Sequence, residues 1–160
     1  MQPIRRRAWA PRGRRPIAVG TPRHAWTYIY GCAHPASGRT AWWLLPMVDT
    51  DAMGAVLAAF AADGGAGPTR RIVLVLDNAG WHTSPRLVVP EGIHPAFLPP
   101  YTPELSPAER LWPLLNEALA NRDHADLPAL DEAVAARCRQ LATQPGTIRA
   151  HAHYHWWPAD

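Results

Sequence analysis

The chain contains no lysine, since all 16 basic side chains are arginine, and this with the abundant Ala and Pro indicates a GC-rich coding bias. It has only two cysteines, Cys32 and Cys138, which lie far apart and form no Cys-x-x-Cys motif. A reducing compartment, with both thiols packed as small apolar groups, is the simpler interpretation. No apolar run reaches the roughly 18 residues of a membrane span, and none follows the N-terminal arginines as in a secretory signal. We therefore expect a cytoplasmic protein with no membrane partner.

Acidic residues are missing from the first part of the chain. Residues 1–48 carry eight Arg and no Asp or Glu, whereas the remainder carries eight Arg and thirteen acids, 8 − 13 = −5. A basic segment ahead of an acidic body fits a protein that holds a polyanion near a metal site. The alternative is a solvated arginine tail without a binding role.

The hydrophobic pattern predicts one domain of the α/β class, with a mixed sheet flanked by helices. Strands are expected at 26–33, 40–45, 72–76 and about 93–98, and helices from Asp49 to Gly64, from Ser106 to about Arg122 and from Leu127 to Leu141. The run 72–76 is continuously apolar, which is typical of a central strand covered on both faces. We expect residues 1–25 to form a basic Arg-rich loop, 26–142 the folded domain and 143–160 a C-terminal tail.

Two carboxylates stand where metal chemistry would need them. Asp77 closes the predicted strand 72–76, and Glu109 lies at the start of the helix that follows a proline-rich loop. In-line displacement at phosphorus is commonly assisted by two Mg²⁺ ions held by carboxylates, because this hard cation prefers oxygen ligands. Each residue also has a structural explanation: Asp77-Asn-Ala-Gly suits a turn, and Ser106 with Glu109 forms a capping box.

Two segments resemble the catalytic domain of mariner-related DDE transposases, in particular bacterial insertion sequences of the IS-six-thirty type. They are LDNAGWH at 76–82 and LPPYTPELSPAERLW at 98–112, and the likeness extends to 7–13, 26–31 and Asn121-Arg122. The resemblance implies an RNase H-like fold, DNA cleavage and joining with Mg²⁺ or Mn²⁺, and DNA as the partner in a bacterial, nucleoid-associated setting. It makes Asp77 and Glu109 metal ligands and catalytic residues, with Trp81 and His82 beside the site.

The family places its first catalytic Asp on a strand before the segment that matches 7–13. Here no acid precedes Asp49, and Asp49 and Asp51 are predicted helix caps. We therefore expect that the first strand is missing or truncated, that the chain is the C-terminal catalytic part of a transposase, and that it is inactive alone. The alternative is a non-catalytic DNA-binding or dimerising remnant of the same fold; the sequence leaves a homodimer open. Phosphate contacts are expected from six arginines: Arg5, Arg6, Arg7, Arg12, Arg14 and Arg15.

Two further patterns each allow a functional and a structural interpretation. His151, His153 and His155 alternate as strand-borne metal ligands would, although a terminal segment packed on the body explains them as well. The aromatic residues of the predicted hairpin, Trp26, Tyr28, Tyr30, Trp42 and Trp43, could stack on bases, but hairpin aromatics more often pack in a core.

Overall fold

The computed structural model describes residues 6, 7, 9–14 and 26–154. An antiparallel hairpin lies at its centre, formed by β1 (Tyr28–His34) and β2 (Arg39–Leu45) with Tyr28 paired to Leu45 and His34 to Arg39. Gly38 closes the turn with φ 72°, and a Cβ at this position would lie 1.9 Å from the carbonyl oxygen of Pro145. The hairpin turn therefore packs against a distant segment so closely that only glycine fits.

A second unit consists of α1 (Thr50–Gly64), β3 (Ile72–Leu76) and β4 (Ile93–Phe97). Asp49 caps α1, its side chain accepting a hydrogen bond from the Ala52 amide at 2.7 Å, and Gly65 ends the helix in the left-handed conformation. The strands β3 and β4 are parallel, with Ile72 paired to Ile93 and Leu76 to Phe97. These elements match the predicted ones to within a residue or two.

The helical unit begins with two 3-10 turns, η1 (Pro103–Leu105) and η2 (Pro107–Leu111), and continues as α2 (Trp112–Leu119), α3 (Leu127–Ala142) and α4 (Pro145–Ala152). The single helix predicted from Ser106 to about Arg122 is therefore wrong, because its first part has 3-10 geometry. Ser106 makes no side-chain capping hydrogen bond, so the predicted capping box does not form.

Helix α4 occupies residues that the sequence placed in a tail. Ile148 and Ala152 are fully buried, and Tyr154 beyond the helix is 6% exposed. Its phenol oxygen donates to the backbone oxygen of Glu104 at 2.6 Å. These contacts join the end of the described chain to the loop that leads into η2.

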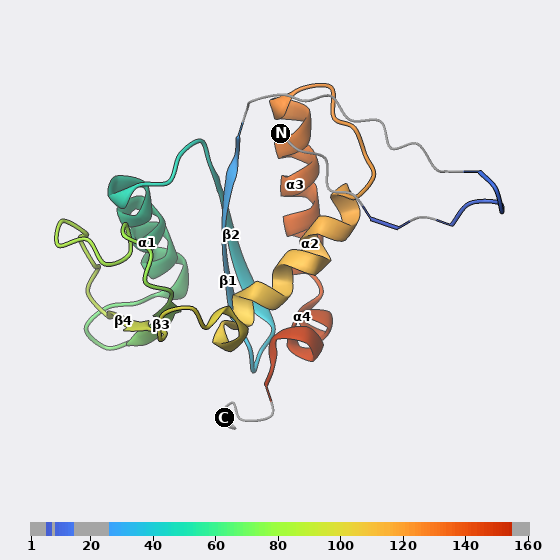
Figure 1. The fold of residues 1–160 in the computed structure, drawn as a ribbon. Coiled ribbons are helices and arrows are strands. Elements are labelled where there is room, and N and C mark those ends of the chain that lie inside the picture. The colour runs from blue at the N-terminus through green and yellow to red at the C-terminus, as the bar shows by residue number, and fades with distance from the viewer. Residues whose placement is uncertain (1–5, 8, 15–25, 155–160) are drawn as a thin grey trace.

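Two separate hydrophobic cores lie on either side of the hairpin (Figure 1). The larger one gathers α2, α3 and α4 on one side, and its buried members are Leu111, Leu115, Leu119, Val134, Cys138, Leu141, Ile148 and Ala152. The smaller one lies between α1 and the β3–β4 pair on the other side, with Met53, Leu57, Ala61 and Ile93. We call these the helical core and the α1 core.

The described strands form two two-stranded sheets, β1–β2 and β3–β4, instead of one continuous sheet. Antiparallel and parallel pairing both occur, as the predicted mixed class requires. In Figure 1, β3 lies nearer to the hairpin than β4 does. β3 is not covered on both faces as expected, because Val73 is 67% exposed.

Candidate metal-binding site

Asp77 follows the last residue of β3 and begins a tight turn. Its Oδ1 accepts hydrogen bonds from the Ala79 amide at 3.1 Å and from Nδ1 of His82 at 2.7 Å. The His82 amide in turn donates to the Ala79 backbone oxygen at 2.9 Å, which closes the turn. The Asp77 side chain is 72% exposed, whereas that of His82 is only 11% exposed. The turn thus orients one carboxylate oxygen by protein contacts and presents the carboxylate to solvent.

His82 is enclosed by two aromatic rings. The rings of Tyr30 and Trp81 meet it edge-on, with centroids 6.3 and 5.8 Å away. Nε2 of His82 and the hydroxyl of Tyr30 are both buried and have no hydrogen-bond partner among the described residues. Burial, and then the charges of Asp49 and Asp77, raise the pKa of Tyr30 above its ordinary value. The surroundings of Asp77 therefore include two polar atoms whose hydrogen-bonding capacity is unused.

Glu109 lies in η2 and is exposed. This turn packs against β1 and α4. Its neighbour Arg110 sits 4.0 Å above the ring of Tyr154 and donates to the backbone oxygen of His151 at 3.3 Å. The position of Glu109 therefore depends on α4, a helix that the sequence did not predict.

His82, the partner of Asp77, contacts Tyr30 of β1, and η2, which carries Glu109, packs on β1. The segments that carry the two carboxylates therefore both border this strand. Both are carboxylates, the ligand type that Mg²⁺ prefers. Among the described residues, however, no group of three or more His, Cys, Asp or Glu side chains could hold a metal ion. Carboxylates are the right type of ligand for such an ion, but the described residues bring too few of them together. No reaction step is therefore assigned to a metal.

The basic N-terminal segment lies elsewhere. Figure 1 shows its described part beyond α2 and α3, on the side of the hairpin opposite to β3. The backbone of Arg6 exchanges two hydrogen bonds with the Asn121 side chain, at 3.0 and 3.2 Å, and its guanidinium donates to the Pro113 oxygen. Arg7, Arg12 and Arg14 are exposed, whereas Arg5 and Arg15 fall outside the described residues.

The other sequence patterns have mostly structural explanations. His151 belongs to α4 and not to a strand, so the alternating strand arrangement is wrong, and His155 lies outside the described residues. Trp42 packs edge-on against Trp112, and Trp43 against Phe60, which makes both part of the interior packing. The exposed hairpin aromatics are Trp26 and Tyr28, at 62% and 40%.

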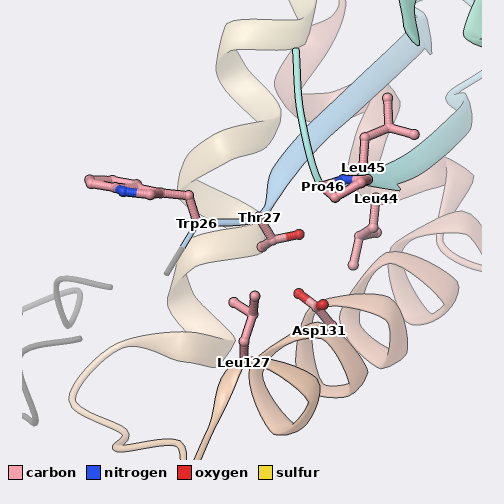
Figure 2. A pocket seen from close by; sticks show the side chains of 7 residues that line it. All are labelled: Trp26, Thr27, Leu44, Leu45, Pro46, Leu127 and Asp131. Carbon is pink, nitrogen blue, oxygen red and sulfur yellow. The ribbon is translucent and has the colours of Figure 1, made fainter. Parts of the chain in front are cut away.

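A pocket of about 150 Å³ lies between the ends of the hairpin strands and the first turns of α3. Figure 2 shows Thr27 from the hairpin and Asp131 from α3 facing the same space. Pockets for small-molecule ligands usually measure about 300–1,000 Å³, so this one suits no nucleotide-sized ligand. None of the predicted catalytic residues lines it.

No helix in the described part of the chain is long and apolar enough to cross a membrane.

Comparison with known proteins gives three findings. A family model described as DDE superfamily endonuclease matches residues 1–131. An uncharacterized protein y4pE/y4sA of Sinorhizobium fredii (strain NBRC 101917 / NGR234) is 38% identical over 134 residues, which cover 82% of this chain and 96% of that protein. The fold is similar to that of a chain in the crystal structure of the Mos1 Strand Transfer Complex, with a TM-score of 0.52 and 16% sequence identity.

The structural match covers 97% of this chain and 52% of the Mos1 chain, so this chain spans about half the length of the solved chain that it matches. At this level of identity the likeness concerns the fold alone. It confirms the predicted α/β class with an RNase H-like arrangement.

Proposed function

The chain belongs to the DDE superfamily endonuclease family, and from this membership we propose that it is the catalytic part of an insertion-sequence transposase. The reaction would be divalent-metal-dependent cleavage and joining of DNA. The observation that carries the proposal is the geometry of Asp77. The turn after β3 orients its carboxylate through two hydrogen bonds to Oδ1 and leaves the side chain 72% exposed.

Asp77 and Glu109 are the proposed metal ligands and catalytic residues. Among the described residues, both hydrogen bonds to the Asp77 carboxylate use Oδ1, so Oδ2 remains for a cation. Mg²⁺ or Mn²⁺ held there would supply Lewis-acid stabilisation of the charge that develops on the phosphate oxygens. His82 orients Asp77, and Trp81 shields one edge of His82.

A third carboxylate is proposed to come from outside the described residues, on a strand placed between β1 and β3. Each of these strands has one partner in the described structure, so each has an unpaired edge. The hydroxyl of Tyr30, on β1, and Nε2 of His82, in the turn after β3, are buried without partners among the described residues. A strand that filled the space would pair both edges and offer donors and acceptors to these atoms.

Translation of the DNA upstream of the Met1 codon in all three frames tests this part of the proposal. An in-frame or frame-shifted strand ending in Asp would support it. The absence of any such strand would contradict it and would favour the remnant described below.

The arginines of residues 5–15 are proposed to contact DNA phosphates without reading sequence. The described part of this segment lies on the side of the hairpin opposite to β3, so its arginines would hold DNA outside the reacting centre. Transposon-end and target DNA are the proposed partners, in a cytoplasmic, nucleoid-associated setting, and a homodimer would bring two such sites together.

Metal binding by the 160-residue chain is the direct test. Titration with Mn²⁺, monitored by isothermal calorimetry, should show weak binding, because a site short of one carboxylate retains few ligands. Asp77→Asn should abolish this binding. Asp63→Asn is the matched control, since Asp63 is an exposed acid on α1, and it should leave binding unchanged. Robust Mg²⁺-dependent nicking of plasmid DNA by this chain alone would contradict the proposed incompleteness of the site.

The alternative function is that of a non-catalytic DNA-binding or dimerising remnant. The lack of any three-residue metal cluster among the described residues favours it. DNA binding with a steep salt dependence and no response to Mn²⁺ or to Asp77→Asn would support this alternative.

A further inference from the structure

Two exposed aromatic side chains lie at the edge of the β3–β4 sheet that also carries Asp77. Because β3 and β4 are parallel, the loops that follow them leave the sheet at the same edge. The Asn78 side-chain amide donates to the Leu98 backbone oxygen, and the Leu98 amide donates to the Leu76 oxygen at 2.8 Å. These bonds join the loop that carries Trp81 to the loop that carries Tyr101.

Tyr101 has a backbone and an exposure that folding does not explain. Its φ is +61°, in the left-handed region that non-glycine residues other than Asn and Asp rarely adopt, and its side chain is 99% exposed. Thr102 holds the turn by donating from Oγ1 to the Pro99 oxygen at 2.7 Å. An aromatic ring held in water by a strained backbone gains no burial energy, and such strain is commonly found at functional sites.

Trp81 is 37% exposed and follows Asp77 in the same turn, with its ring against His82. One part of the indole is thus fixed by a neighbour while the rest faces solvent. Both aromatic residues therefore come from loops that leave the β3–β4 sheet at the edge that carries Asp77.

The charge of these loops argues against phosphate attraction as the source of DNA affinity at this edge. Residues 77–105 contain one Arg and three acids, 1 − 3 = −2. The described part of the arginine-rich segment lies on the other side of the hairpin. DNA that reaches this edge would therefore need contacts that do not depend on positive charge, and stacking of bases on aromatic rings is such a contact, since every base has a π-face.

We propose that Trp81 and Tyr101 form a stacking surface for unpaired DNA bases at the edge of the sheet that carries Asp77. The inference rests on the proposed function, because it assumes that DNA reaches this edge. It adds the class of DNA that the edge selects: single-stranded or locally unpaired DNA, in preference to intact duplex.

The test uses the full 160-residue chain and a fluorescein-labelled single-stranded oligonucleotide, with binding followed by fluorescence anisotropy in EDTA. Loss of one stacked base corresponds to about a 5- to 150-fold rise in Kd. Tyr101→Leu and Trp81→Leu should each weaken binding within that range, while Tyr101→Phe retains it within about twofold because the ring remains. Tyr28→Leu removes an aromatic side chain of the hairpin that is 40% exposed and is the matched control.

A second variant separates function from folding. Tyr101→Asn tolerates a positive φ and lacks the ring, so the thermal midpoint should not fall while binding weakens as in Tyr101→Leu. The slope of log Kd against log salt should stay the same in all ring-deleting variants, since stacking releases no counterions. A 2-aminopurine base in the oligonucleotide should be quenched by the wild-type chain and less so by Tyr101→Leu.

Unchanged Kd values in Tyr101→Leu and Trp81→Leu, or equal affinity of the wild-type chain for single-stranded and duplex DNA, would overturn the stacking surface. The assay contains no metal, so it does not depend on Asp77 as a ligand. If stacking is found but Mn²⁺ binding is absent, the metal site fails while the surface stands. If Mn²⁺ binds and stacking is absent, the stacking surface fails while the metal site stands.

Discussion

The two cores of this molecule are covered to very different extents. The helical core has eight buried residues from η2, α2, α3 and α4, closed over by the hairpin. The α1 core has four, and the strand that leads to Asp77 contributes none that is fully buried. Val73 and Phe97, on β3 and β4, are 67% and 46% exposed. Stability therefore resides mainly in the half that lacks Asp77, and the proposed site sits on the half with fewer buried contacts, which we expect to open more readily.

Truncation of a buried leucine should have the largest effect and should separate the two halves. Leu115 in the helical core and Leu57 in the α1 core are both fully buried. Leu115→Ala should lower the free energy of unfolding by about 2–5 kcal/mol in urea denaturation. Leu57→Ala should mainly speed hydrogen exchange of amides in α1, β3 and β4. Equal acceleration in α3 by Leu57→Ala would show that both cores unfold as one cooperative unit.

Two glycines offer a paired test of close backbone packing, one in each half. Gly38 and Gly92 have φ of 72° and 84°, and an added Cβ would lie 1.9 Å from the Pro145 oxygen and 2.3 Å from the Gly67 nitrogen. Gly38→Ala and Gly92→Ala should each cost more than about 1 kcal/mol in chemical denaturation. Gly54→Ala is the control: nothing lies within 4 Å, and alanine inside α1 should stabilise by about 0.5–1 kcal/mol.

The helix caps give a smaller and matched comparison. Asp126 caps α3 and Asp49 caps α1, each accepting a hydrogen bond from a first-turn amide, at 2.9 and 2.7 Å. Either Asp→Ala variant should cost about 1 kcal/mol, whereas Asp→Asn keeps most of the cap. Thermal unfolding followed by circular dichroism measures this. A much smaller loss at Asp49 would show that α1 is already frayed.

Asp49 has a second, pH-dependent consequence that Asp126 lacks. Its charge helps to raise the pKa of Tyr30, so Asp49→Ala should lower that pKa, as followed by ultraviolet absorbance during titration. The native phenol binds its proton more tightly than the unfolded one, so its contribution to stability is complete below about pH 10 and is lost as the pH rises through the folded pKa. An unchanged titration in Asp49→Ala would place the cause in burial and in the charge of Asp77.

The thiols should show the smallest change in stability but a clear chemical signature. Burial raises the pKa of Cys32 and of Cys138 to about 11. Compared with thiols of ordinary pKa 9.0, alkylation by iodoacetamide near pH 8 should be about 100-fold slower, because the thiolate is the nucleophile. Urea should restore the ordinary rate. Fast labelling of Cys32 in the native protein would mean that β1 is more open than its burial indicates.

Much of the secondary structure could be predicted from local patterns. The apolar run 72–76 forms β3. The apolar residues Met53, Val56 and Leu57, spaced as on one face of a helix, form the buried face of α1. The predicted end of α1 at Gly64 and Gly65 is confirmed by the left-handed C-cap. Such signals need no partner, because caps, breakers and periodicity act within a few residues.

The failures lie where distant segments meet. Ser106 and Glu109 have the residue types of a capping box, yet the turn is 3-10, packed between β1 and α4. Helix α4 was missed because Pro145 and Gly146 resemble a helix stop, whereas the helix is buried by its packing against η2, α3 and β2. The roles of Asp77, Glu109 and the arginines stay predictions.

The sequence by itself determined the α/β class, the family resemblance and the positions of Asp77 and Glu109 at element ends, since these depend on residue order alone. Only the tertiary structure decided that His82 orients Asp77, that the loops carrying Trp81 and Tyr101 are joined, and that Arg6 is bound to Asn121. Those arrangements depend on which strands pair and in which direction. Strand pairing is set by burial and hydrogen bonding across the whole chain, and a local pattern of residues does not contain it.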